Sequence, residues 1–196
     1  MTEGVPETGD KKLLRAAMKA RRAAMPAALR ADGARRLAER GLGWLEPAPD
    51  AIVSGFLSIA DELDTAPLLV ALHRLGHRLC LPVMQGRGRP LLFRTYTPGD
   101  ALATVVWGIQ EPFPEKAELE PDMLLVPLLA ADMQGHRLGY GGGFFDRTLR
   151  ALRQKKPVIA IGLAFEEQVV DAVPHLDYDE RLDWVLTPSG PRRTER

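Results

Sequence analysis

The hydrophobic residues of the chain fall into short, nearly continuous apolar runs that alternate with amphipathic stretches. Runs with the length of buried strands lie at 51–57, 78–82, 91–95, 123–129, 157–164 and 184–186. Stretches with the spacing and composition of helices lie at 11–25, 26–41, 65–75 and 146–153. Because buried strands that alternate with helices form parallel sheets covered on both faces, the pattern predicts an α/β fold. We expect a single three-layer domain with a mainly parallel, Rossmann-like sheet.

The first two helices form a predicted N-terminal helical hairpin, residues 11–41, that precedes the sheet. Pro26 suits the first turn of the second helix, and Gly41 ends that helix. The first helix carries an apolar stripe and a separate basic stripe, which consists of Lys11, Arg15, Lys19 and Arg22. Farther along, Thr65 is the expected N-cap of the helix at 65–75.

The composition narrows the class of protein. The chain has 196 residues, with 26 basic and 26 acidic side chains, so it lacks an overall charge that would attract nucleic acid or an anionic membrane. The single cysteine, Cys80, excludes an internal disulfide, and no apolar run reaches the roughly 18 residues of a membrane span. We expect a cytoplasmic monomer that binds neither nucleic acid nor membrane. Its domain is expected to cover residues 11–188, with flexible polar tails at 1–10 and 189–196.

One stretch, from Gly135 to Arg147, is poor in core-forming side chains and carries glycines at 139, 141, 142 and 143. It follows a predicted strand and precedes a predicted helix, so backbone N–H groups and the positive end of the helix face whatever lies in the loop. Such a site suits phosphate, and Arg137 adds positive charge. The glycine spacing matches neither the dinucleotide fingerprint nor a Walker loop. A plain connection would need fewer glycines, so the stretch is interpreted as a ligand site.

Several charged residues near these elements allow two interpretations each. Asp146 is either a helix N-cap or a ligand of Mg²⁺, because Mg²⁺ bound with nucleotide phosphates takes one or two protein carboxylates. Asp61 and Glu62 follow the first predicted strand, where open α/β sheets bind ligands, but a capping role or a solvated turn fits equally. Lys11 and Arg15 lie one helical turn apart, and their alternative is a solvated helix face.

The glycine stretch resembles the 5-formyltetrahydrofolate cyclo-ligase family, also called 5,10-methenyltetrahydrofolate synthetase. The family segment Gly-x-Arg-Leu-Gly-x-Gly-x-Gly-Tyr-Tyr-Asp is matched from Gly135 to Asp146, with Phe144-Phe145 in place of the two tyrosines. The likeness spans nearly the whole chain, and its further matches are Lys11 to Arg15, Leu57-Ser58, Glu62 to Thr65, Gly108 to Pro112, Val126-Pro127, Ile161 to Phe165, Gln168 and Val185 to Pro188. Some members carry Arg where this chain has Tyr140 and Lys where it has Gly142, so the loop here has less positive charge.

The resemblance implies roles for individual residues. It places ATP at Lys11, Arg15, Arg137, Leu138, Gly139, Tyr140, Gly141, Gly142, Gly143, Phe144 and Phe145. It places a reduced folate at Leu57, Glu62, Tyr140 and Phe144. Of these, Lys11 and Arg137 would supply catalytic positive charge. Mg²⁺ would bind Asp146 and a second carboxylate, for which Asp183 is preferred and Asp179 is the alternative.

The activity that the resemblance implies is the ATP- and Mg²⁺-dependent cyclisation of 5-formyltetrahydrofolate to 5,10-methenyltetrahydrofolate, through a phosphorylated formyl group, with release of ADP and phosphate. Two other classes of function stay open. A sugar-phosphate isomerase of the same broad fold would need neither ATP nor Mg²⁺. A non-catalytic nucleotide-binding or RNA-associated module is suggested by the basic first helix, although the neutral charge and Glu62 count against it.

Overall fold

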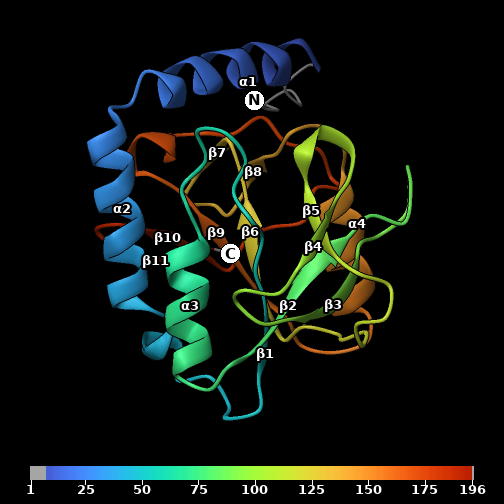
Figure 1. The fold of residues 1–196 in the computed structure, drawn as a ribbon. Coiled ribbons are helices and arrows are strands. Elements are labelled where there is room, and N and C mark those ends of the chain that lie inside the picture. Colours follow the sequence, from blue (N-terminus) through green and yellow to red (C-terminus); the bar gives the residue numbers. More distant parts are fainter. Residues whose placement is uncertain (1–7, 196) are drawn as a thin grey trace.

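The computed structural model describes residues 8–195 and shows a sheet between two layers of helices (Figure 1). The helices are α1 Thr8–Ala23, α2 Ala27–Arg40, α3 Ala66–Arg74 and α4 Phe144–Arg153, and short 3-10 turns lie at Gly43–Leu45, Val106–Gly108 and Glu166–Gln168. The main sheet contains β1 Ile52–Ser54, β2 Arg78–Val83, β3 Leu92–Tyr96, β6 Met123–Pro127, β9 Ile159–Leu163, β10 Trp184–Thr187 and β11 Gly190–Arg193. Two small hairpins pair β4 Leu102–Thr104 with β5 Gln110–Pro112, and β7 Ala130–Ala131 with β8 Arg137–Leu138. Most of the expected N-terminal tail, residues 1–7, lies outside the described residues.

The strand order of the main sheet is β11-β10-β9-β6-β1-β2-β3. The five strands from β10 to β2 are parallel to one another, and only the edge strands β11 and β3 run antiparallel to their neighbours. The predicted mainly parallel sheet is therefore confirmed. Because parallel strands end at one common edge, the loops that follow β1 and β6 begin at the same edge, where α/β sheets bind ligands.

Alternate side chains of the central strand β6 divide the core into two layers. Leu125 lies in a cluster with Leu37 of α2 and Leu72 of α3. Leu124, on the opposite side of the strand, lies in a cluster with Leu149 of α4. Since successive strand residues point to opposite faces, α2 and α3 cover one face of the sheet and α4 covers the other. This arrangement confirms the three-layer α/β prediction.

A short turn joins α1 to α2, in agreement with the predicted helical hairpin. The two helices meet at a wide angle, so that α2 packs beside α3 while α1 crosses one end of the molecule above β7 and β8 (Figure 1). The apolar stripe of α1 holds it there, because Met18 is buried in a cluster with Leu129 and Leu138. As a result, the basic stripe of α1 is brought to the glycine stretch.

The C-terminal segment differs from its prediction. Residues 190–193, expected to lie in a flexible tail, form β11 and pair with β10. The polarity of the segment was misleading because strand pairing uses backbone groups, which every residue except proline supplies in full. Thr194 fastens the end of the strand by donating from its hydroxyl to the carbonyl of Leu182 at 2.7 Å.

The segment between β1 and α3 also differs from its prediction. β1 ends at Ser54, and the residues that follow form a loop. Thr65 does not cap α3 with its side chain, since its hydroxyl donates to the carbonyl of Phe56 within this loop. The carboxylate of Asp64 instead accepts a hydrogen bond from the N–H of Ala66 at 3.0 Å. Thr65 therefore stabilises the loop that carries Glu62.

Candidate active site

The glycine loop, residues 139–143, begins after β8 and ends where α4 starts. The sequence predicted that it would follow the strand at 123–129 directly, but the β7–β8 hairpin lies between them. The local signal for that hairpin is the turn from Asp132 to Gly135, in which Gly135 adopts a φ of +87° and Asp132 accepts from the N–H of His136. The hairpin places the loop beneath α1.

The backbone of the glycine loop presents unpaired N–H groups. Among residues 8–195, no acceptor faces the N–H groups from Gly139 to Asp146. Two of the loop carbonyls are held by arginines instead: Arg15 donates to Gly139 O at 3.0 Å, and Arg147 donates to Gly142 O at 2.8 Å. With these two carbonyls bound and its N–H groups free, at the N-terminus of α4, the loop is suited to bind an anion.

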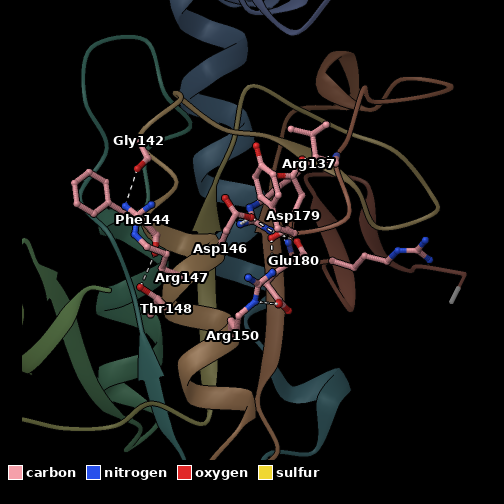
Figure 2. Close-up of polar contacts among 12 residues, drawn as sticks. Arg137, Gly142, Phe144, Asp146, Arg147, Thr148, Arg150, Asp179 and Glu180 are labelled. Carbon is pink, nitrogen blue, oxygen red and sulfur yellow. Dashed lines mark hydrogen bonds and ion pairs between the residues drawn. The ribbon is translucent and has the colours of Figure 1, made fainter. Parts of the chain in front are cut away.

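Asp146 lies in the first turn of α4, whose N-cap is Gly143 with a φ of +64°, so the N-cap interpretation of Asp146 is wrong. Its Oδ1 accepts from Arg137 Nη2 at 2.5 Å and from the N–H of Glu180 at 3.1 Å (Figure 2). Arg137 also donates to the carbonyl of Glu180, and its side chain is only 5% exposed. Burial lowers the pKa of Arg137 from its ordinary value, and the carboxylates of Asp146 and Asp179 oppose that shift.

Three members of the basic stripe of α1 make contacts in the site, so Lys11 and Arg15 do not lie on a solvated helix face, whereas Lys19 is exposed. Lys11 Nζ lies 2.5 Å from Asp179 Oδ2, and both side chains are largely buried. Arg15 contacts the glycine loop through Gly139, as described above. Arg22, which the sequence placed on the stripe but not in the site, is buried and donates to the hydroxyl of Tyr140 at 2.6 Å. The signal for Arg22 was its position on the same helical stripe as Lys11 and Arg15.

The structure places Asp146 and Asp183, the metal ligands that the family resemblance favours, in different surroundings. Asp183 accepts from Arg153, the last residue of α4, at 2.9 Å and from the N–H of Ala160 at 2.8 Å. Asp146 lies in the first turn, so about 10 Å of helix separates it from Arg153. The contacts of Asp183 with Arg153 and Ala160 lie toward the C-terminal end of α4, which favours Asp179 over Asp183 as the partner of Asp146.

Asp179, the alternative, lies beside Arg137, Asp146 and Glu180 (Figure 2). Within the described chain, no three side chains of His, Cys, Asp or Glu are grouped to hold a metal by themselves. Two neighbouring carboxylates at an anion site nevertheless fit Mg²⁺, which keeps water and phosphate ligands and needs only one or two from protein. Asp146 also has an Oδ2 atom that makes no hydrogen bond within residues 8–195.

The predicted folate residues Leu57 and Glu62 lie together on the loop after β1. Leu57 is half-buried against the core, and Glu62 accepts from the N–H of Ile59 at 2.9 Å through Oε2. Glu62 Oε1 accepts from the hydroxyl of Tyr140, so the structure joins this loop to the glycine loop. Burial and the adjacent Glu62 raise the pKa of Tyr140, which keeps its hydroxyl protonated.

The side chains of three further residues that the resemblance assigns to ATP, Leu138, Phe144 and Phe145, lie in different surroundings. The side chain of Leu138 is buried under α1, so only its backbone is available to a ligand. Phe145 packs against the core layer that includes Leu149, whereas the ring of Phe144 lies 5.3 Å from the guanidinium carbon of Arg147. The two phenylalanines that replace the family tyrosines therefore have different environments.

In the described part of the chain, no helix is long and apolar enough to cross a membrane.

Comparison with known proteins identifies the family of the chain. A model described as the 5-formyltetrahydrofolate cyclo-ligase family matches residues 7–188. The 5-formyltetrahydrofolate cyclo-ligase of Escherichia coli (strain K12) is 40% identical over 142 residues, which cover 70% of this chain and 78% of the relative. That of Mycolicibacterium smegmatis is 34% identical over 188 residues, which cover 91% of this chain and 93% of the relative.

Solved structures share the architecture. The 5,10-methenyltetrahydrofolate synthetase of Aquifex aeolicus aligns with a TM-score of 0.73 at 26% identity, over 95% of this chain and 93% of that one. The synthetase of Mycoplasma pneumoniae, 21% identical, has the same fold with a TM-score of 0.71, over 91% of this chain and 99% of that one. Because the family model covers nearly the whole chain and the relatives match both its sequence and its fold, the chain belongs to the 5-formyltetrahydrofolate cyclo-ligase family.

Proposed function

We propose that the protein catalyses the ATP- and Mg²⁺-dependent cyclisation of 5-formyltetrahydrofolate to 5,10-methenyltetrahydrofolate, with release of ADP and phosphate. One observation carries the proposal: the glycine loop has unpaired N–H groups from 139 to 146 and is flanked by Lys11, Arg15 and Arg137. This arrangement fits a polyphosphate. Glu62, which is joined to the same loop through Tyr140, offers a carboxylate to the N–H groups of a pterin.

In the proposed reaction, the γ-phosphoryl group of ATP passes to the formyl oxygen and ADP is left. N10 of the folate then attacks the formyl carbon, the C–O bond breaks, phosphate leaves, and the proton of N10 is released to solvent. These steps need no protein nucleophile, because phosphoryl transfer depends chiefly on positioning and on positive charge. Lys11 and Arg137, which both lie beside Asp179, are proposed to supply that charge. Mg²⁺, held by Asp146 and Asp179, would neutralise phosphate charge.

The direct test is to incubate the purified protein with ATP, Mg²⁺ and 5-formyltetrahydrofolate and to follow the absorbance of the methenyl product. Product is expected only when all three are present, and chelation of Mg²⁺ with EDTA is expected to stop its formation. Formation of product without ATP would contradict the proposed phosphoryl transfer. A complete absence of product under all conditions would contradict the proposed activity.

Glu62→Gln is expected to raise KM for 5-formyltetrahydrofolate by about tenfold or more while KM for ATP changes by less than about twofold. The reason is that a hydrogen bond to a charged group contributes about 1.5–3 kcal/mol, and the amide removes that charge. Steady-state kinetics with each substrate varied in turn will measure both constants. Glu120→Gln is the control, since Glu120 pairs with Lys155 beyond the C-terminal end of α4. An equal loss for both substrates in Glu62→Gln would indicate misfolding, not a folate contact.

A further inference from the structure

The hydroxyl of Tyr140 connects the two halves of the candidate site. It donates to Glu62 Oε1 on the loop after β1 and accepts from Arg22 Nη1 of α1 at 2.6 Å. Arg22 reaches the same loop directly, through Nη2, which lies 2.9 Å from Asp61 Oδ1. A single side chain of the glycine loop is therefore bonded to the carboxylate proposed to bind folate.

Tyr140 occupies a position that can move. It stands between Gly139 and Gly141, and Gly141 has a φ of +99°, so the backbone on both sides lacks the restriction that a Cβ atom imposes. The residue is 43% exposed, and its ring contacts are with cations, Lys19 and Arg22, each 5.8 Å from the ring centroid. Polar contacts, not core packing, hold the side chain in place.

The hydrogen bond from Tyr140 to Glu62 affects the binding of folate to this carboxylate. The tyrosine O–H and the N–H groups of a pterin are both hydrogen-bond donors. Oε1 of Glu62 already accepts from Tyr140 and Oε2 from the N–H of Ile59, so fewer lone pairs of this carboxylate are left for the pterin. Phosphate binding uses the loop N–H groups, among them that of Tyr140 itself. If residue 140 shifts about its two flanking glycines to bring this N–H to a phosphate, its hydroxyl parts from Glu62.

We propose that Tyr140 is a latch: it occupies Glu62 in the ligand-free protein and is released when a nucleotide binds the glycine loop. This inference rests on the proposed function, in which Glu62 binds the folate. It makes binding of the two substrates positively coupled, so that each one tightens the other by the same factor. Folate is thereby bound tightly only when the phosphoryl donor is present.

The test measures the Kd of 5-formyltetrahydrofolate with and without a non-hydrolysable ATP analogue and Mg²⁺. In the wild type, the analogue is expected to lower this Kd by about fivefold or more, within the usual range of such couplings. Tyr140→Phe keeps the ring and removes the donor. It is expected to bind folate about fivefold more tightly without nucleotide, and the effect of the analogue is expected to fall below about twofold. Tyr96→Phe, on β3, is the matched control and should behave as the wild type.

The possible outcomes separate the latch from the proposed function. If the wild type binds both ligands but the analogue leaves the Kd of folate unchanged, the latch is wrong and the proposed function stands. If Tyr140→Phe keeps the full coupling of the wild type, the latch is also wrong. If neither wild type nor variants bind 5-formyltetrahydrofolate, the proposed function fails and the latch fails with it. The reciprocal measurement, the Kd of the analogue with and without folate, must give the same factor.

Discussion

Asp146→Asn is expected to lower kcat/KM by about a hundredfold or more while the protein stays folded. The amide keeps an oxygen in the place of Oδ1, so the contacts with Arg137 and with the N–H of Glu180 can persist. What is lost is the negative charge that would hold Mg²⁺ against the phosphates. Removing one preorganised electrostatic contact of a transition state typically lowers kcat by about 100-fold to 1,000-fold. Steady-state kinetics over a range of Mg²⁺ concentrations, with thermal unfolding as the check of folding, will measure the effect.

Asp183→Asn is the matched control, because it makes the same chemical change at the opposite end of α4. Asp183 accepts from Arg153 and from the N–H of Ala160, so its replacement is expected to lower the melting temperature. Its kcat is expected to stay within about threefold of the wild type. Near-normal turnover of Asp146→Asn at saturating Mg²⁺ would refute the metal assignment. Loss of activity in Asp183→Asn without loss of stability would return Asp183 to the site.

Arg137→Lys is expected to lower kcat/KM by about a hundredfold or more at saturating Mg²⁺, even though the positive charge is kept. Arg137 donates from two nitrogen atoms, to Asp146 and to the carbonyl of Glu180, and an ammonium group cannot reproduce that planar fork. Because the side chain is almost fully buried, a partner left unsatisfied should also lower the free energy of unfolding by about 1–3 kcal/mol. Kinetics at saturating ATP and denaturant unfolding will separate the two effects.

Arg150→Lys provides the comparison for this substitution. Arg150 also contacts the segment after β9, through Glu180 at 3.2 Å and the carbonyl of Tyr178 at 2.7 Å, but its side chain is about half exposed. Exposed ion pairs contribute about 0–1 kcal/mol, so its replacement should leave both kcat/KM and stability nearly unchanged. Equal effects of Arg137→Lys and Arg150→Lys on activity would show that activity depends on anchoring the segment around Glu180 in general, and not on the two hydrogen bonds of the Arg137 guanidinium.

Local sequence patterns could predict the elements and much of the site. Apolar runs located the central strands such as β6, because a strand buried on both faces has to be apolar throughout. The glycine loop could be recognised in the sequence, because a cluster of glycines beside an arginine indicates a ligand-binding loop more than a plain connection. Lys11 and Arg15 could be assigned to ATP only through the family resemblance. The local sequence does not show whether a charged side chain on a helix contacts another part of the protein or faces solvent.

The features that the sequence did not reveal depend on contacts between distant segments. Asp179 and Asp183 are close together in the sequence. Only the path of the chain past α4 shows that Asp179 lies beside Arg137 and that Asp183 contacts Arg153. The burial of Arg22 requires both Tyr140 and Asp61 to be in place. β11 likewise formed from a polar segment because the edge of β10 was available to pair with it. Such outcomes follow from tertiary structure and leave no periodic signal in the chain.

The contact between Lys11 and Asp179 has a consequence for how the protein is made. It joins residues 168 positions apart, so the two sides of the anion site come from the beginning and near the end of the chain. During synthesis, the helix that carries Lys11 leaves the ribosome long before its partner exists. Until the segment that carries Asp179 has emerged and folded, the chain has no complete site. Only from that point can a ligand bind the native state and shift the folding equilibrium in its favour.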